Sequence, residues 1–350
     1  MLTETQVAEV REHLEKAQNP IFFFDNDPDG LCSFLLLQRY IGRGRGVAIK
    51  SFPHMEAGYF RKVSELNADY IFILDKPLVS KEFFDKVKEV NIPVVWIDHH
   101  EVEAEAPDFV NYYNPVLNSA KTNEPVTALC YQITGNKEDI WIAVAGCVSD
   151  SFFPPFYKEF KEKYPELSVE TNDAFEVVYN SRVGDIIRLL SNGLKDTVTN
   201  VVLMIKFLFK VKSPYDLLEE NSKNKVLHKR SEKINERYDK ILEKGKKVGE
   251  KPGDVLFFRY SGDLSVSGEI SNHLKYLFPK KIVVVAYIGG SKVNLSLRGK
   301  GIKEKFLKAI EGIDGATGGG HNDAVGGQHI SGDLDKFKKN FQEIIDKGQI

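Results

Sequence analysis

The apolar positions of the first 150 residues follow two alternating patterns. Short, continuous apolar runs at Pro20–Phe24, Tyr70–Leu74 and Pro93–Ile97 predict strands that are buried on both faces. The segments Gly30–Tyr40 and Ser80–Val90 lie between these runs and have the spacing of amphipathic helices. Such alternation predicts an α/β fold, a doubly wound parallel sheet with helices on both sides. Two further helices are predicted at Glu124–Thr134 and Glu138–Val148.

The pattern changes twice after this region. From residue 152 to 249 strand signals largely vanish, and helical spacing predicts a helical connector. A mixed α/β pattern then returns and continues to the end of the chain. We therefore expect an N-terminal domain over residues 1–150, a helical connector over 151–250 and a smaller mixed α/β domain over 251–350. Beyond residue 150 the predicted helices are Ser181–Ser191, Val198–Phe209, Leu227–Glu243, Ser267–Leu277, Lys303–Ile310 and Leu334–Lys347, the predicted strands are Asp254–Arg259, Lys281–Ile288 and Ser291–Arg298, and a glycine-rich loop is predicted at 315–320.

Composition places the chain among folded, water-soluble proteins. Of its 350 residues 42% are hydrophobic and 28% are charged, which is ordinary for a globular protein. The longest apolar runs are far shorter than a membrane span. The three cysteines, Cys32, Cys130 and Cys147, are widely spaced and odd in number, so they predict neither a disulfide framework nor a zinc knuckle. We expect a cytoplasmic protein with no membrane association.

The net charge of −2 conceals a basic segment near the C-terminus. Nine Lys or Arg residues and a single acid, Glu304, lie between Lys275 and Lys308. This imbalance favours a polyanionic partner. A second stretch, residues 223–247, has ten bases against four acids and is interpreted more simply as a solvated surface.

Acidic residues and histidines follow the predicted strands of the first domain. Asp25, Asp27 and Asp29 come after the first strand, Asp75 after the second, and the triplet Asp98-His99-His100 after the third. Asp150 ends a predicted helix. The carboxyl ends of parallel strands meet at one edge of the sheet, so these side chains are expected to converge.

Each of these acids has an ordinary structural explanation when it is taken alone. An Asp at the start of a helix usually caps it, and an Asp at the end of a strand is usually a turn residue. Their joint occurrence points to a metal centre, because clustered carboxylates repel one another unless cations neutralise them. Oxygen-rich ligation without thiolates favours Mn²⁺ or Mg²⁺. The number of carboxylates suits two ions, which together activate a water for attack on phosphorus.

At this point the sequence resembles a known family, the DHH phosphoesterases, through the triplet Asp98-His99-His100. The other motifs occur in the expected order and extend to the C-terminus, where they are similar to a DHHA1 domain. The resemblance covers roughly residues 18–150 and 250–345 and favours the RecJ-like branch over the inorganic-pyrophosphatase branch, because of Phe23 and Asp25. The matching motifs are Asp25-Asn26-Asp27-Pro28-Asp29-Gly30, Ile73-Leu74-Asp75, Gly146-Cys147-Val148-Ser149-Asp150, Ser296-Leu297-Arg298 and the glycine-rich segment 318–327.

The resemblance implies roles for single residues. Two Mn²⁺ ions would be held by Asp27, Asp29, Asp75, His99 and Asp150, with Asp75 as the bridging ligand. Asp25 would support these ligands, and His100 would approach the substrate phosphate. The role of Asn26 stays open, because this position is often His or Tyr in the branch.

The C-terminal domain has phosphate-binding features of its own. In the strand Ser291–Arg298, Asn294, Ser296 and Arg298 share one face, from which Arg298 could offer a bidentate fork to a phosphate. The glycines at 318–320 could expose backbone N–H groups to an anion, with His321 beside them. We expect Ser296, Arg298, Gly319, Gly320 and His321 to bind substrate.

The activity that these features favour most is Mn²⁺-dependent hydrolysis of a phosphodiester between a metal-bearing and a substrate-gripping domain. Single-stranded DNA or RNA, cut as an exonuclease, is the first substrate class, and the basic segment would follow its backbone. The alternative is a phosphodiesterase for short oligonucleotides or cyclic dinucleotides. A scaffold of replication or repair that has lost catalysis is less favoured, because the metal-ligand set is intact. The sequence names no protein partner, although a replication or repair protein is possible.

Overall fold

The computed structural model describes residues 1–51, 53–101 and 106–348. The chain forms two compact units, Met1–Ser231 and Glu232–Ile350, here called the first and the second unit. Among the described residues, no helix has the length and apolar character needed to cross a membrane.

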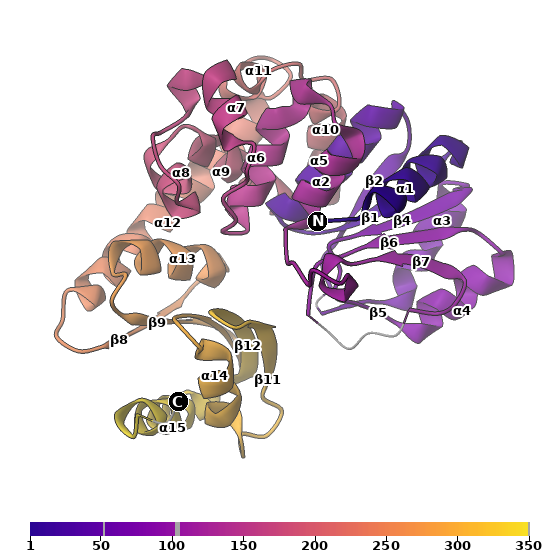
Figure 1. Cartoon of the computed structure of the whole chain (residues 1–350). Helices are drawn as coiled ribbons and strands as arrows, with labels where there is room; N and C mark the ends of the chain where they lie inside the picture. The colour runs from indigo at the N-terminus through magenta and orange to yellow at the C-terminus, as the bar shows by residue number, and fades with distance from the viewer. Residues whose placement is uncertain (52, 102–105, 349–350) are drawn as a thin grey trace. The chain divides into compact units, whose positions relative to one another are not determined.

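The first unit is built on a five-stranded parallel sheet (Figure 1). The three predicted strands are confirmed, while the two edge strands, β2 and β7, are not foreseen by the sequence reasoning. Both edge strands are only partly buried, so they lack the continuous apolar run that reveals the central strands. The strands are β1 (Pro20–Asp25), β2 (Arg45–Ile49), β4 (Tyr70–Leu74), β6 (Val94–Ile97) and β7 (Val110–Tyr113), in the order β2-β1-β4-β6-β7, and a separate parallel pair joins β3 (His54–Met55) to β5 (Leu78–Val79).

Helices cover both faces of this sheet, as the doubly wound prediction requires. Alternate residues of one strand serve different cores: Phe22 and Phe24 face one layer of helices, and Ile21 and Phe23 face the other. All four side chains are buried, which explains why β1 is apolar throughout. The first layer contains α1 (Glu4–Lys16), α2 (Pro28–Ile41), α5 (Val126–Thr134) and α6 (Ile140–Ser149), and the second contains α3 (Phe60–Glu65) and α4 (Lys81–Val90).

The region expected to be a helical connector is shared between the two units. Leu190, Met204 and Leu227 belong to the same hydrophobic core as α2 and α6, so most of its helices pack onto the first unit. The long helix α12 starts in the first unit and ends in the second, where Leu242 is buried. The helices are α7 (Tyr157–Lys163), α8 (Ala174–Asn180), α9 (Val183–Leu194), α10 (Val198–Leu208), α11 (Pro214–Leu218) and α12 (Lys225–Gly249).

The second unit contains a mixed five-stranded sheet in the order β11-β12-β10-β9-β8. The pair β8–β9 is parallel and the other pairs are antiparallel. One face packs on α13 and the end of α12, and the other on α14 and α15. The elements are β8 (Val255–Ser261), α13 (Ser267–Leu277), β9 (Ile282–Gly289), β10 (Lys292–Arg298), α14 (Ile302–Ile310), β11 (Thr317–His321), β12 (Ala324–Ile330) and α15 (Leu334–Asp346). Short 3₁₀ turns occur in both units at Ala57–Tyr59, Pro115–Leu117, Lys137–Asp139, Pro165–Leu167 and Ser331–Asp333.

The glycine-rich segment 315–320 is largely a strand, so the prediction of a loop there is wrong. Gly318 and Gly319 belong to β11, which pairs with β12 in an antiparallel hairpin. A Cβ atom on Gly318 would lie 2.6 Å from the ring of Phe306. A Cβ atom on Gly327 would lie 2.2 Å from the same ring. These two glycines therefore make room for a buried aromatic side chain.

Candidate metal centre

A tight turn between β1 and α2 presents the first group of acids. Asp27 is the N-cap of α2 and accepts a hydrogen bond from the backbone N–H of Gly30 at 2.9 Å. A Cβ atom at position 30 would lie 2.5 Å from the carbonyl oxygen of Asp25, so only glycine permits this approach. The capping role considered for Asp27 is thus real. It also fixes the direction of the Asp27 carboxylate at the end of the sheet.

Asp75 enters the same region from the neighbouring strand. The order β2-β1-β4 means that the chain leaves β1 toward β2 on one side and reaches β4 on the other. Crevices at such a switch point are the usual ligand sites of open parallel sheets. Asp75 has a φ of +59°, a left-handed conformation that is uncommon for residues other than glycine. Strained backbone of this kind is concentrated at functional sites.

The triplet after β6 supplies two differently held imidazoles. The Nδ1 atom of His100 lies 2.8 Å from a carboxylate oxygen of Asp98, which is fully buried. The Nδ1 atom of His99 lies 2.9 Å from the amide oxygen of Asn123. These contacts direct the Nε2 atom of His99 toward Asp75 at 3.5 Å and toward Asp150 at 3.9 Å. Anchoring Nδ1 in this way is typical of metal-binding histidines.

Asp75 belongs to three groups of closely spaced ligand atoms, one of them with Asp98 and His100. The other two groups contain predicted metal ligands. In one group, oxygens of Asp25, Asp27 and Asp75 all lie within 4.8 Å of one another. In the other, atoms of Asp29, Asp75 and His99 meet the same limit. A carboxylate common to two adjacent groups has the position that a bridging ligand needs.

Asp29 and Asp150 are placed by two helices of the first layer. The carboxylate of Asp29 accepts hydrogen bonds from the backbone N–H groups of Val126 at 3.0 Å and Thr127 at 2.8 Å, at the start of α5. Each oxygen keeps a second lone pair for a cation. Asp150 follows the last turn of α6, and Gly146 in that helix allows close packing, because a Cβ atom there would lie 2.2 Å from the Thr127 hydroxyl.

The pKa values of the clustered side chains are raised, which indicates that their negative charges need compensation. Burial, followed by the carboxylates of Asp25 and Asp29, raises the pKa of Asp27 to about 8. Burial and then Asp150 raise the pKa of Asp29 to about 6, and burial with the neighbouring acids raises the pKa of Asp75 well above its usual range. Burial alone would lower the pKa of His99, but nearby carboxylates outweigh it and raise the value.

A further buried acceptor lies in the same turn. The side-chain oxygen of Asn26 is buried and accepts no hydrogen bond from the residues that the structure describes. Together with the clustered carboxylates and the imidazole of His99, this oxygen gives a hard, oxygen-rich donor set. The residues therefore fit two divalent cations of the Mn²⁺ or Mg²⁺ type.

Lys76 is the main residue of this region that the sequence reasoning missed. Its side chain is 0% exposed, and its ammonium donates to a carboxylate oxygen of Asp25 and to the carbonyl oxygen of Ser51, both at 2.8 Å. The indole N–H of Trp96 donates to the backbone carbonyl of Lys76 at 2.9 Å. Lys76 therefore holds Asp25 beside the other acids. The only signal in the sequence is its position directly after Asp75.

The partners of the two histidines were also missed as site residues. Asp98 orients His100 and Asn123 orients His99. Asp98 could have been found, since it belongs to the quoted triplet. Asn123 lies 24 residues beyond His99 in an irregular segment, and no pattern marks it.

The predicted phosphate-binding residues lie in the second unit and already have internal contacts. The predicted alternation along β10 is confirmed, with Val293, Leu295 and Leu297 in one hydrophobic core. On the other face the Ser296 hydroxyl donates to that of Ser267 at 2.9 Å. The guanidinium of Arg298 donates to Asn272 and to the carbonyl of Leu297, so part of its fork is used within the chain.

The other three predicted phosphate-binding residues lie on β11, at the edge of the sheet. Gly319, Gly320 and His321 belong to β11, where they pair with Gly326, Val325 and Ala324 of β12. Because β11 is an edge strand, alternate backbone N–H groups point away from the sheet.

Fold and site together define a two-part α/β protein with a carboxylate-rich candidate centre for divalent cations. Residues 21–149 match the family described as DHH family, N-terminal domain, and residues 254–347 match the DHHA1 domain. The chain belongs to the DHH/DHHA1 superfamily. No curated protein matches the sequence significantly.

Solved structures of the same fold include two described as RecJ in complex with manganese. RecJ from Thermus thermophilus with Mn²⁺ is 15% identical, with a TM-score of 0.69, over 98% of this chain and 54% of that chain. Exonuclease RecJ bound to manganese is 15% identical, with a TM-score of 0.64, over 97% of this chain and 94% of that one. A pGpG-specific phosphodiesterase, PggH from Vibrio cholerae, is 14% identical, with a TM-score of 0.50, over 94% and 99%. Because the match covers 54% of the Thermus protein, this chain spans about half of its length.

Proposed function

We propose that the chain hydrolyses phosphodiester bonds with the help of two divalent cations, Mn²⁺ in preference to Mg²⁺. The observation that carries this proposal is that Asp75, in a strained backbone conformation, belongs both to a group with Asp25 and Asp27 and to a group with Asp29 and His99. Bound cations would supply charge to stabilise the transition state at phosphorus and would lower the pKa of the attacking water.

The residues of the chain would divide this work. Asp27, Asp29, Asp75, His99 and Asp150 would hold the cations, and Asp25 would support them from its ion pair with Lys76. His100 would contact the substrate phosphate. The contact between its Nδ1 atom and the buried Asp98 at 2.8 Å orients the ring, and its Nε2 atom would reach the phosphate oxygen.

Single-stranded nucleic acid, degraded as an exonuclease, is the substrate class that we favour. It is supported by the likeness in fold to proteins described as RecJ and by the basic segment from Lys275 to Lys308. In the second unit, Ser296, Arg298 and the hairpin edge at Gly319, Gly320 and His321 would contact phosphates. We also propose a cytoplasmic location and a partner protein of replication or repair.

A second candidate is a phosphodiesterase for short oligonucleotides or cyclic dinucleotides. The fold of this chain covers nearly the whole of a protein described as a pGpG-specific phosphodiesterase. This likeness in fold supports a substrate of dinucleotide size.

Hydrolysis of end-labelled substrates tests both candidates. Single-stranded DNA and RNA of several lengths, and a cyclic dinucleotide, would be incubated with Mn²⁺, with EDTA, and with the Asp75→Asn variant. Hydrolysis that needs Mn²⁺ and Asp75 is expected. Equal turnover in EDTA, or in the variant at saturating Mn²⁺, would exclude the two-cation centre.

Salt dependence then separates a polymer from a dinucleotide. Neutralising Lys300, Lys303 and Lys305 together should make the salt dependence of binding to long single strands shallower, by roughly 0.7 in slope per lost phosphate contact. Hydrolysis of a dinucleotide should hardly change in the same variant. An unchanged slope on long strands would favour the small-substrate candidate.

A further inference from the structure

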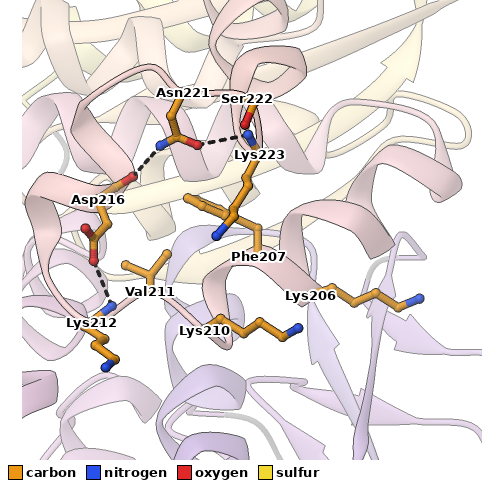
Figure 2. Close-up of a pocket in the computed structure, with 9 residues that line it drawn as sticks. All are labelled: Lys206, Phe207, Lys210, Val211, Lys212, Asp216, Asn221, Ser222 and Lys223. Atoms are coloured by element: carbon orange, nitrogen blue, oxygen red, sulfur yellow. Dashed lines mark hydrogen bonds between the residues drawn. The ribbon is translucent and has the colours of Figure 1, made fainter.

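A hollow of about 580 Å³ lies in the helical part of the first unit (Figure 2). It is formed by the last turn of α10, the start of α11 and the segment that precedes α12. Phe207 and Val211 give it an apolar floor, and Lys206, Lys210 and Lys223 stand among the side chains around it. In Figure 2, Lys223 extends back toward Phe207, whereas Lys206 and Lys210 extend outward.

The side chains around this hollow carry an excess of positive charge. Lys206, Lys210, Lys212 and Lys223 are exposed, and none of them forms an ion pair with an acid among the described residues. The single acid in the lining is Asp216. Its carboxylate is engaged locally, because it accepts hydrogen bonds from the backbone N–H groups of Lys212 at 3.0 Å and Ser213 at 3.1 Å. The hollow is therefore a site of net positive charge.

Apolar side chains extend this surface along α10. Val202 and Leu203 are 39% and 54% exposed, and Val198 one turn earlier is more exposed still. Val202 and Leu203 lie four and three residues before Lys206, so they share a helix face with it. Contiguous exposed apolar residues beside a charged rim are typical of a protein interaction site.

The floor of the hollow is held firmly in place. Arg39, near the end of α2, donates to the carbonyl oxygens of Leu208, Phe209 and Val211, the last at 2.6 Å. The same guanidinium pairs with the buried Asp139 at 2.7 Å. A partner would thus find a preformed surface, which reduces the entropy cost of binding.

This surface is also remote from the metal centre. Asp29 and Arg39 lie at opposite ends of α2, and ten residues of α-helix span about 15 Å. A group bound beside Val211 is therefore not the reacting phosphate.

From these features we infer that the hollow and the adjacent face of α10 bind an acidic, amphipathic helix of a protein partner. The apolar side of such a helix would cover Val202, Leu203 and the floor at Phe207 and Val211. Its carboxylates would pair with the lysines of the rim. A nucleic acid strand fits less well, because Phe207 is a single aromatic side chain and the exposed side chains beside it on α10 are aliphatic, so successive bases have no stacking platform. The inference does not depend on the proposed hydrolase activity.

Binding of a designed peptide tests the inference. The probe is a fluorescein-labelled peptide of about four helical turns, with Leu at every third or fourth position and Glu elsewhere on its surface. A peptide of the same composition in scrambled order and a labelled single-stranded oligonucleotide serve as comparison ligands. Fluorescence anisotropy with the full-length protein should show saturable binding of the amphipathic peptide only.

Two variants and matched controls locate the site. Lys210→Glu with Lys223→Glu should weaken peptide binding by about tenfold or more, because two attractive charges become repulsive. Leu203→Gln should weaken it by about threefold to tenfold through the loss of apolar burial. The controls, Lys81→Glu with Lys86→Glu and Val90→Gln, change exposed residues of α4 in the same way and should have no effect.

The outcomes are decisive in either direction. Loss of peptide binding in both site variants, with normal binding in both controls and normal circular dichroism throughout, supports the inference. Failure of the peptide to bind, or equal binding of the scrambled peptide, overturns it. Oligonucleotide binding that is lost in the double lysine variant but unchanged by Leu203→Gln would also overturn it and would identify a nucleic-acid surface.

Discussion

The ion pair between Lys76 and Asp25 provides the sharpest test of how the metal centre is held together. Lys76→Met keeps the length of the side chain and removes its charge. In the variant, Asp25 loses its ammonium partner at 2.8 Å, and the carbonyl of Ser51 loses its donor. The Asp25 carboxylate would then face Asp27 and Asp75 without a compensating charge.

Two magnitudes follow from this geometry. Removing one partner of a buried ion pair costs about 3–5 kcal/mol, because the remaining charge is left uncompensated. The Asp25 side chain is 20% exposed, so water can solvate part of its uncompensated charge. We therefore expect Lys76→Met to lower the free energy of unfolding of the first unit by about 3 kcal/mol. Loss of a group that orients metal ligands should also weaken Mn²⁺ binding by about 10- to 100-fold.

Tryptophan fluorescence provides a selective assay. The chain has two tryptophans, Trp96 and Trp141, and both are buried in the first unit. Urea unfolding followed by their emission therefore reports on the unit that contains the ion pair. Isothermal titration with Mn²⁺ gives the second quantity.

A double-mutant cycle separates the ion pair from simple packing. Asp25→Asn alone leaves Lys76 buried without its counter-charge and should also destabilise the first unit. The combination with Lys76→Met should cost less than the sum, with a coupling energy of about 1–3 kcal/mol. Lys81→Met, on the exposed surface of α4, is the control and should lie within about 0.5 kcal/mol of the wild type. Wild-type stability and Mn²⁺ affinity in Lys76→Met would refute the reasoning.

Three further predictions concern the metal ligand, the phosphate contact and the thiols. Asp75→Asn keeps a residue that tolerates a positive φ, so thermal melting in EDTA should show an intact fold, while stabilisation by Mn²⁺ and hydrolysis are lost. Arg298→Ala should lower kcat/KM by roughly one to three orders of magnitude without changing Mn²⁺ binding in calorimetry, because a charge-assisted contact to substrate is removed. Burial raises the pKa of Cys32, Cys130 and Cys147 well above the usual thiol range, so a triple Ala variant that folds should retain hydrolytic activity.

The fold was predictable where burial on both faces of a strand requires a continuous run of apolar residues. The central strands β1, β4 and β6 are apolar throughout because helices cover both of their faces. The edge strand β2 mixes exposed and buried positions, so nothing distinguishes it from a loop. The glycines of β11 were misinterpreted for a related reason. Glycine has no side chain whose alternation could reveal a strand, and the space that it leaves for Phe306 depends on distant residues.

The site was predictable to the extent that its residues follow strands. Asp75 and His99 could be found because parallel strands bring their ends together wherever the chain runs. Lys76 is polar, fully buried and paired with a residue 51 positions away, and Asn123 reaches His99 from an irregular segment. Contacts of this kind depend on three-dimensional packing, which one sequence does not encode in any local pattern.

The space around Phe306 has an evolutionary consequence. Gly318, Gly327 and Phe306 fit one another so closely that none can change independently: a methyl group at either glycine meets the ring, and a smaller residue at 306 leaves a void beneath the hairpin. A Cβ atom at 318 would also lie 2.6 Å from the carbonyl oxygen of Gly326, and one at 327 would lie 2.9 Å from that of Thr317. A smaller residue at 306 would therefore not by itself admit a side chain at either position. We expect both glycines and the phenylalanine to be retained together in homologues.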